Sequence, residues 1–431
     1  MRGNDPISKD LDWLTIFLYL GLVGYGCISI YSAVYNPFEE QSVFDFSTKA
    51  GTQLIWVFIS FIIAVLILIV DFRIIFGASY PLYAFFVFLL VCVLLFGIEV
   101  NGAKAWFQIG SVRIMPAEFS KIGIALALAK FMDDYPSKLG MNKNTGILLL
   151  IVAIPALIIL KQNETGTVLI FTSIIIMLFR EDLSPAIPLY GLVVVALFVI
   201  TLAHITYDKS LLWVYLGVDI LGSVIFLFGI WIKKKPVWIM GIALIAGMTI
   251  VIYSTQFIVE EVLQPHQQKR LISMIDPEKD PQESGYQTLH SKKAISTGGF
   301  SGKGYLQGNL TQGDYIPEQH TDFIFTTLGE ERGFKGAFVF IILYLGFLIR
   351  LIFIAERQKS RFARVFGYVT IGIIFWHFMV NIGMTIGLFP VIGIPLPFFS
   401  YGGSSLLSFT IMIFVFLKLD MHRSQILARN N

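Results

Sequence analysis

The chain carries little charge. Only 14% of its 431 residues are Asp, Glu, Lys or Arg, whereas a soluble globular domain contains about 25%. Because hydrophobic residues make up 56%, the composition excludes an ordinary soluble domain and indicates a protein whose surface lies largely in hydrocarbon. The net charge of +3 is small, so the charge balance does not indicate a nucleic-acid partner.

Cysteines and metal-ligand patterns are equally sparse. Cys27 and Cys92 both lie within apolar runs, and we interpret them as small core residues, not as a disulfide or a metal site. The six histidines are dispersed along the chain and show no metal-ligand spacing. No metal site is therefore predicted from the protein's own side chains.

The sequence also lacks the motifs of familiar soluble enzymes. It has no Gly-x-Ser-x-Gly elbow, which argues against a serine hydrolase. The glycines around Lys303 look suited to phosphate, but Gly304 follows the lysine where a Walker A loop requires Ser or Thr. A nucleotide-driven pump is therefore disfavoured.

Long hydrophobic runs are abundant. By the ~20-residue criterion for crossing a bilayer, the chain has about twelve of them, and the predicted fold is an all-α polytopic membrane protein. The fifth and sixth runs are short and nearly fused, and the last begins in a Gly/Ser-rich stretch. The runs lie near residues 13–33, 51–70, 80–98, 116–131, 146–160, 165–179, 186–205, 211–232, 237–258, 334–355, 366–388 and 400–417.

The short loops predict the orientation in the membrane. The links at 138–143, 233–235 and 357–364 are basic, as is the tail at 418–429. With a cytoplasmic amino terminus, all four lie on the cytoplasmic side, as the positive-inside bias requires. Both termini are then cytoplasmic, and the Trp106 loop and the acidic loop near residue 40 lie outside.

A polar island at residues 259–322 interrupts the apolar pattern between the ninth and tenth runs. It contains two Asp-Pro pairs, a group of glycines and the string Pro-Glu-Gln-His-Thr-Asp-Phe that begins at Pro317. The same parity of crossings places this loop outside the cytoplasm. Because it gathers carboxylates, basic residues and glycines, we expect the chemistry of the protein there.

A few ionisable residues lie within apolar runs, where a charge at mid-membrane costs roughly 2.5–3.5 kcal/mol. Glu118 and Lys121 are three residues apart and share a helix face, so they form either a functional pair or a self-neutralising pair near the interface. Glu164 either binds a substrate cation or caps a helix. Asp219 and His377 are interpreted as hydrogen-bonding residues between helices.

Several segments carry a resemblance to a known family. They are Asp-Pro-Glu-Lys-Asp-Pro at 276–281, Gly-Lys-Gly-Tyr at 302–305, the string from Pro317, Gly-Glu-Glu-Arg-Gly at 329–333, Asn-Ile-Gly-Met at 381–384 and Gly-Ile-Pro-Leu-Pro-Phe-Phe-Ser-Tyr-Gly-Gly-Ser-Ser at 393–405. This pattern resembles the SEDS family (shape, elongation, division and sporulation) from the Trp106 loop to the last helix. The Gly-Lys-Gly-Tyr segment favours the elongation branch over the division branch.

The resemblance implies a peptidoglycan glycosyltransferase that polymerises lipid II on the outer face of the bacterial cytoplasmic membrane. It implies a class B penicillin-binding protein as partner. The second aspartate of the Asp-Pro loop, Asp280, matches the family's essential catalytic carboxylate, and Trp106, Glu118 and Lys121 match other family positions. The family has ten helices in one membrane domain, so residues 1–431 would form one such domain with about two extra helices within residues 186–258.

The chemistry of that reaction suits these residues. Forming a β-1,4 bond with inversion needs one base close to the attacking sugar hydroxyl, a role that fits Asp280, although this residue could instead only begin a turn. The pyrophosphate leaving group needs cations, and a divalent ion such as Mg or Mn could accompany it. The candidates for contact with substrate are Trp106, Glu118, Lys121, Glu164, Arg270, Lys292, Lys303, His320, Asp322 and Ser400.

The chain departs from the family pattern at several places. Ala105 replaces the usual arginine before Trp106, with Lys104 one residue earlier, and Asn163-Glu164 replaces the usual Pro-Asp. After Asp280-Pro281 comes Gln-Glu-Ser where the family has an apolar, glycine-containing pair. The first of these changes leaves no arginine for a fixed role directly before Trp106.

Two other functions fit the composition. A flippase or transporter for a lipid-linked precursor would also have many helices and buried charges, but the chain shows no obvious inverted repeat and its polar residues concentrate in one outer loop. A scaffold that only activates a transpeptidase would not need the carboxylates. Polymerisation of lipid II by the purified protein discriminates among the three.

Overall fold

The computed structural model describes residues 11–35, 42, 45–100, 102–110, 112–135, 143–207, 235–313 and 315–423, with a few isolated positions between 217 and 227. The chain divides into two compact units. The first unit comprises Met1–Leu183, His290–Thr385 and Ile392–Asn431, and the second comprises Ser184–Leu289 and Ile386–Val391. Each is described separately.

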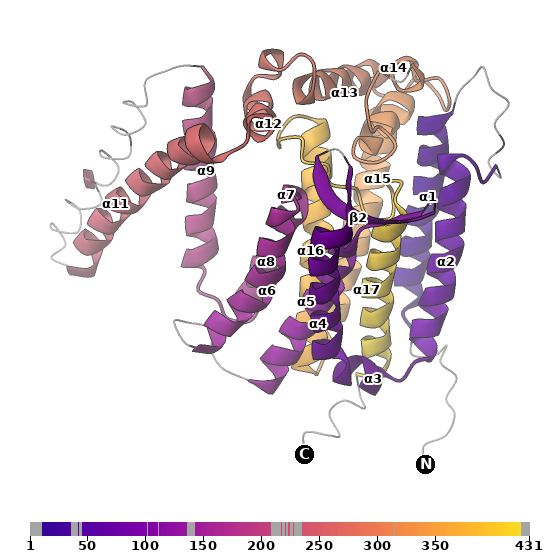
Figure 1. The fold of residues 1–431 in the computed structure, drawn as a ribbon, viewed down its shortest axis with the longest axis horizontal. Helices are drawn as coiled ribbons and strands as arrows, with labels where there is room; N and C mark the ends of the chain where they lie inside the picture. Colours follow the sequence, from indigo (N-terminus) through magenta and orange to yellow (C-terminus); the bar gives the residue numbers. More distant parts are fainter. Residues whose placement is uncertain are drawn as a thin grey trace. The chain divides into compact units, whose positions relative to one another are not determined.

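The first unit is built of helices with one small sheet (Figure 1). Helix α13 (Ser284–Gly298) begins in the second unit and ends in the first. The other helices of the first unit are α1 (Trp13–Val34), α2 (Lys49–Ile69), α3 (Phe72–Gly77), α4 (Ser79–Phe96), α5 (Pro116–Asp134), α6 (Lys143–Lys161), α7 (Thr165–Phe171), α8 (Ile174–Arg180), α14 (Asn309–Gln312), α15 (Ile324–Glu356), α16 (Arg361–Thr385) and α17 (Gly403–Met421).

Nine helices of the described residues are long and apolar enough to cross a membrane, which confirms a polytopic, helical membrane protein. Three of the about twelve predicted runs are not among these nine helices. The fourth is α5, which carries Glu118 and Lys121 and is not among the nine. The sixth is divided into α7 and α8, with seven residues each, and most of the eighth, at 211–232, lies outside the described residues.

Burial separates the helices of the first unit into two classes. The apolar windows of α16 and α17 are 78% and 83% buried, against 17% for α2 and for α4. Helix α5 packs against α4, α16 and α17, and a side chain at Gly123 would come within 2.9 Å of the Phe86 ring. Small residues along α5 therefore let it enter the middle of the bundle, where it cannot face lipid.

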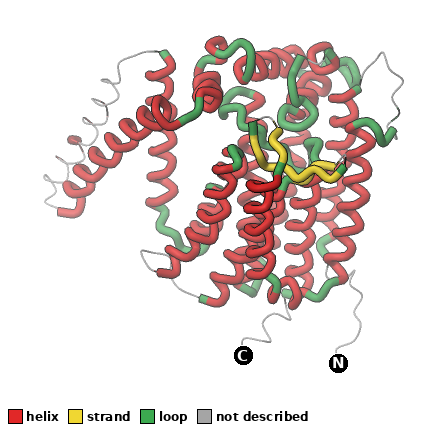
Figure 2. Tube along the Cα trace, in the orientation of Figure 1, coloured by secondary structure: helices red, strands yellow, loops and turns green. Residues whose placement is uncertain are grey.

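The Trp106 segment forms a sheet that the sequence did not predict (Figure 2). Strands β1 (Ile98–Val100), β2 (Ala103–Ile109) and β3 (Val112–Ile114) are antiparallel in the order β1-β2-β3. Trp106 lies opposite Ile98. The all-α expectation therefore holds for the spans but is wrong for this connection, because strand pairing satisfies the backbone polar groups of a segment that is not helical.

Helix α15 is interrupted at Gly333, whose φ of 63° and ψ of −161° are not helical. A side chain there would lie 2.3 Å from the backbone nitrogen of Gly302. Only glycine combines this backbone conformation with so close an approach. The apolar part of α15 begins directly afterwards, in agreement with the run predicted at 334–355.

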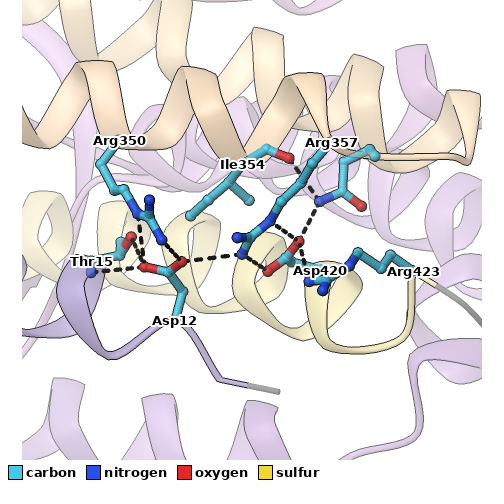
Figure 3. A network of polar contacts seen from close by, with 8 residues as sticks. Asp12, Thr15, Arg350, Ile354, Arg357, Asp420 and Arg423 are labelled. Carbon is cyan, nitrogen blue, oxygen red and sulfur yellow. Dashed lines mark hydrogen bonds and ion pairs between the residues drawn. The ribbon is translucent and has the colours of Figure 1, made fainter. Parts of the chain in front are cut away.

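An ionic cluster joins the ends of three helices of the first unit (Figure 3). Asp12, just before α1, accepts hydrogen bonds from Thr15, from Arg350 of α15 and from Arg357, which follows α15. Arg357 also pairs with Asp420 near the end of α17. Although burial raises the pKa of Asp12, its hydrogen bonds with Arg350 and Thr15 outweigh that effect and lower this pKa to about 2.

The second unit contains α9 (Ala186–Thr206) and α11 (Lys235–Phe257), which pack against each other. A π-helical turn at Ile258–Val262 leads to α12 (Pro265–Ile275) and to a 3₁₀ turn at Pro277–Lys279. A capping box between Gln264 and Gln267 begins α12, since the two glutamines satisfy otherwise unpaired backbone N–H groups. The two extra helices within residues 186–258 stay a prediction, because most of residues 208–234 lies outside the described part of the chain.

Candidate functional site

The Asp-Pro loop of the second unit is built from two consecutive caps. Asp276 accepts a hydrogen bond from the Glu278 backbone nitrogen at 3.2 Å and thereby begins the 3₁₀ turn. Asp280 ends that turn, and its Oδ2 accepts from the backbone nitrogens of Ser284 at 2.9 Å and Gly285 at 3.4 Å. Asp280 thus stabilises the start of α13, where a carboxylate complements unpaired N–H groups.

The hydroxyl of Ser284 adds a third donor to the same carboxylate oxygen. Ser284 Oγ lies 2.7 Å from Asp280 Oδ2 and 2.8 Å from Ser273 Oγ on α12. Gly285 is required beside it, because a side chain there would lie 2.1 Å from the Pro277 carbonyl oxygen. Ser284 therefore lies in direct contact with the proposed catalytic residue.

The two oxygens of Asp280 differ in their surroundings. The residue is only 4% exposed, and Oδ2 takes all three hydrogen bonds given above, whereas Oδ1 receives none from the described residues. Asp280 therefore ends the 3₁₀ turn and also accepts hydrogen bonds from the start of α13. These hydrogen bonds occupy one oxygen and hold the other in a defined direction, which is the arrangement a general base requires.

Basic side chains of the second unit flank this loop. Arg270 lies half-buried on α12. Lys269 and Glu283 are exposed and 3.8 Å apart, so their pairing contributes little. Lys279 donates to the carbonyl oxygen of Thr206 at the end of α9, and this contact anchors the 3₁₀ turn to the unpaired carbonyls of a helix end.

A buried ionic network occupies the middle of the first unit. Lys121 Nζ lies 2.7 Å from Glu118 Oε2 and 3.1 Å from His377 Nε2. It also lies 4.5 Å from the centre of the Phe409 ring, and Ser408 donates to Glu118 at 3.3 Å. Lys121 is 0% exposed and Glu118 5% exposed, so protein encloses this pair almost completely.

His377 connects this network to the loop before α17. Its Nδ1 lies 3.0 Å from the Pro395 carbonyl oxygen. A carbonyl can only accept, so Nδ1 carries the proton and Nε2 accepts from the Lys121 ammonium. The prediction that His377 makes hydrogen bonds between helices is confirmed, whereas Asp219 lies outside the described residues.

The structure brings three of the quoted motifs together. Asn381 Nδ2 donates to the carbonyl oxygens of Asp322 at 2.8 Å and Ile394 at 2.7 Å. Ser400 Oγ donates to the Thr321 carbonyl, and the Tyr401 nitrogen donates to the His320 carbonyl at 2.9 Å. The candidates His320 and Asp322 therefore belong to one hydrogen-bonded assembly with Ser400, which lies nearly 80 residues later in the sequence.

Lys303 is held by an ion pair. Its Nζ lies 2.6 Å from Glu330 Oε1, and the side chain of Glu330 is 0% exposed. Glu330 also accepts from the backbone nitrogens of Leu310 and Thr311 at 3.0 and 2.9 Å. Neighbouring Glu331 accepts from Ser32 and from the Leu306 nitrogen. The glycine-rich segment is thus folded around two buried carboxylates.

The sheet that carries Trp106 is fastened to the α6–α7 junction. The backbone nitrogen of Lys104 donates to the Gln162 carbonyl at 3.0 Å, and Asn163 Nδ2 donates to the Gly102 carbonyl at 3.2 Å. Glu164 occupies the position before α7 but makes no side-chain capping bond to that helix. It interacts electrostatically with Lys121, so the acidic side chain belongs to the surroundings of the buried network.

The candidate residues therefore fall into several local groups. Lys121, Glu118 and Glu164 share one region of the first unit, Asp280 and Arg270 lie in the second, and Lys292 is exposed on α13. Within the described ranges, no group of three or more His, Cys, Asp or Glu could hold a metal ion.

Sequence reasoning assigned no role to several buried polar residues. These are Glu330, Glu331, Asn381 and Ser408. The first three lie within motifs quoted for the resemblance, and Ser408 is a small polar residue in an apolar run. A polar group in a membrane helix needs a partner, so the sequence could have indicated that these residues form polar contacts. It does not indicate with which residues.

Comparison with known proteins relates the whole chain to one family. The family model FTSW_RODA_SPOVE, described as "Cell cycle protein", matches residues 12–215 and 192–425. The peptidoglycan glycosyltransferase MrdB of Escherichia coli K12 is 31% identical over 96% of this chain and 95% of its own length. The peptidoglycan glycosyltransferase RodA of Treponema pallidum is 30% identical over 97% and 99%.

Two solved structures resemble this chain over nearly its full length. A chain of a peptidoglycan synthase complex, described in terms of the coordination of polymerization and crosslinking, is 26% identical with a TM-score of 0.69, covering 96% of this chain and 99% of its own. The rod shape determining protein RodA of Thermus thermophilus is 22% identical with a TM-score of 0.61, covering 97% and 99%. The latter likeness supports the fold alone.

Proposed function

The chain belongs to the FtsW/RodA/SpoVE family of cell cycle proteins, and from this premise we infer that it is a peptidoglycan glycosyltransferase of the RodA type. It polymerises lipid II into glycan strands for cell-wall elongation and cell shape. The observation that carries this conclusion is the identity of about 30% to peptidoglycan glycosyltransferases over nearly the full length of the chain.

In the proposed reaction, Asp280 is the general base. The 4-hydroxyl of one sugar attacks the anomeric carbon of another, and a new carbon–oxygen bond forms with inversion. The bond from that carbon to the lipid pyrophosphate breaks, and the hydroxyl proton passes to Asp280 Oδ1. The three hydrogen bonds to Oδ2 support this assignment, since they orient the carboxylate without engaging its other oxygen.

The proposed pyrophosphate contacts come from cations that keep free donors. Arg270 is suited to bidentate contact with phosphate oxygens, and Lys292 is exposed. Lys121 and Lys303 already pair with Glu118 and Glu330, so we assign them to holding the surrounding segments in place. A divalent ion would arrive with the substrate pyrophosphate.

Trp106, Glu164, His320, Asp322 and Ser400 stay in the proposal as residues that shape the substrate region. The protein is proposed to act in the bacterial cytoplasmic membrane with both termini inside and residues 259–322 outside. The basic cytoplasmic links predicted from the sequence support this orientation. A class B penicillin-binding protein is the proposed partner, because the solved relative is part of a peptidoglycan synthase complex.

The test is polymerisation of purified lipid II by the detergent-solubilised protein together with its class B partner. We expect glycan ladders from the wild type and none from Asp280→Asn. Asparagine retains an oxygen that can cap α13 but cannot accept the proton. Asp276→Asn is the matched control, since it changes the other Asp-Pro aspartate and should retain activity.

If Asp280→Asn made as much glycan polymer as the wild type, Asp280 would not be the general base. If no version polymerised lipid II but the protein moved it across liposome membranes, the flippase alternative would replace the proposed function. A folded Asp280→Asn variant that still activated crosslinking by the partner at the wild-type level would favour the scaffold.

A further inference from the structure

The hydroxyl of Ser284 makes a contact that helix capping does not require. The backbone N–H groups of Ser284 and Gly285 already satisfy the start of α13 through Asp280 Oδ2. The side-chain hydroxyl of Ser284 donates a further hydrogen bond to the same oxygen at 2.7 Å. It is buried, with Ser284 6% exposed and Ser273 1% exposed, so water does not replace this contact freely.

The donors and acceptors can be assigned by counting protons. An ionised carboxylate only accepts, so the single hydroxyl proton of Ser284 points to Asp280. The 2.8 Å contact between Ser284 and Ser273 then requires the Ser273 hydroxyl as donor. Ser273 can also donate to the Arg270 carbonyl oxygen at 3.0 Å, so its one proton is shared between two acceptors on α12 and α13.

This chain of hydroxyls restricts the carboxylate plane. Rotation about the terminal torsion of an aspartate is soft, and two backbone donors that converge on one oxygen do not prevent it from turning. A third donor, itself attached to α12 through Ser273, defines the plane. The remaining oxygen, Oδ1, then points in one direction relative to both helices.

We propose that Ser284 is a positioning residue for Asp280, and that Ser273 holds Ser284 in its donating orientation. The proposal deepens the proposed function and rests on it, because it assumes that Asp280 is the base. Reaction rates depend steeply on the direction of a base. Ser284 is therefore part of how this chain orients its catalytic carboxylate.

The experiment compares steady-state lipid II polymerisation by the full-length protein with its partner. We expect Ser284→Ala to lower kcat about tenfold with the KM for lipid II unchanged, because one hydrogen bond to the base is lost while both backbone bonds remain. Ser273→Ala should lower kcat about threefold, since Ser284 retains its bond to Asp280. Ser284→Thr restores the hydroxyl and should recover most of the activity.

Ser296→Ala is the matched control on the same helix. Its hydroxyl is exposed and donates only to the Lys293 carbonyl three residues earlier, so its kcat should equal that of the wild type. Thermal unfolding of each variant measures whether a loss of activity is a loss of folding.

A wild-type kcat for Ser284→Ala, with Asp280→Asn inactive, would overturn this inference and leave the proposed function intact. Failure of Ser284→Thr to recover activity while it folds normally would also overturn it, since the hydroxyl would then not be the group that matters. Full activity of Asp280→Asn would instead overturn the assignment of the base itself.

Discussion

Replacing Lys121 with methionine should strongly destabilise the first unit. The substitution preserves the length of the side chain but removes the ammonium that lies 2.7 Å from Glu118 and 3.1 Å from His377. Among the described residues, Glu118 would keep only the longer hydrogen bond from Ser408 at 3.3 Å. A carboxylate would then remain almost fully enclosed without its counter-charge.

The expected magnitude follows from the burial of the pair. Lys121 is 0% exposed, and removal of one partner from a buried ion pair costs about 3–5 kcal/mol because the other charge stays behind. Removal of both charges, in Lys121→Met combined with Glu118→Gln, avoids that penalty. The double variant should therefore be about 2 kcal/mol more stable than the sum of the two single changes predicts.

The measurement is the free energy of unfolding of each variant in mixed detergent micelles titrated with a denaturing detergent. Lys130→Met is the matched control on the same helix, since Lys130 pairs with Asp134 but the two side chains are 17% and 32% exposed. That change should cost under about 1 kcal/mol. Additive effects of the Lys121 and Glu118 changes would refute the reasoning, because independent sites add.

Two further predictions concern other carboxylates of the first unit. The pKa of Asp12 is about 2 when folded, below its unfolded value of about 3.9, so its stabilisation is present above pH 4 and is lost as the pH falls through 2. It amounts to about 2 kcal/mol. The stability difference between wild type and Asp12→Asn should therefore shrink from pH 5 to pH 2.5, and a constant difference would contradict the ion-pair assignment. In Glu330→Gln, the amide cannot accept from Lys303 and from the two backbone nitrogens as the carboxylate does. Hydrogen exchange of the Leu310 and Thr311 amides should accelerate at least about tenfold. The control is Lys335→Met, which changes an exposed residue of α15. Unchanged exchange in Glu330→Gln would show that other contacts hold the segment.

The candidate site was predictable where its chemistry is local in the sequence. The Asp-Pro loop was identified from the carboxylates and glycines of one polar island, and the fold places caps at Asp276 and Asp280 as Asp before Pro favours. The contact between Asp280 and Ser284 is also local, but it was not predicted. Its formation depends on the turn that brings residue 284 back to residue 280, and on Gly285, which permits the close approach.

The placement of α5 was not predictable in the same way. Its apolar run predicted a membrane span, yet burial by α4, α16 and α17 distinguishes it from the lipid-facing helices. Hydropathy measures how apolar a segment is and does not tell whether lipid or protein surrounds it. The sheet at Trp106 was missed for a related reason, since short strands in a connection depend on pairing with each other.

The sequence by itself determined the class of the protein, the position of most spans, the polar island and the family, because length, hydropathy and contiguous motifs are properties of neighbouring residues. Only the tertiary structure decided which polar groups meet. Lys121 and His377 are 256 residues apart, and the pairing of Glu330 with Lys303, of Asn381 with Asp322 and of Asp12 with Arg350 likewise joins separate segments. Because desolvation of a buried charge is costly, the sequence shows that such a residue needs a partner. The identity of that partner depends on how the helices pack.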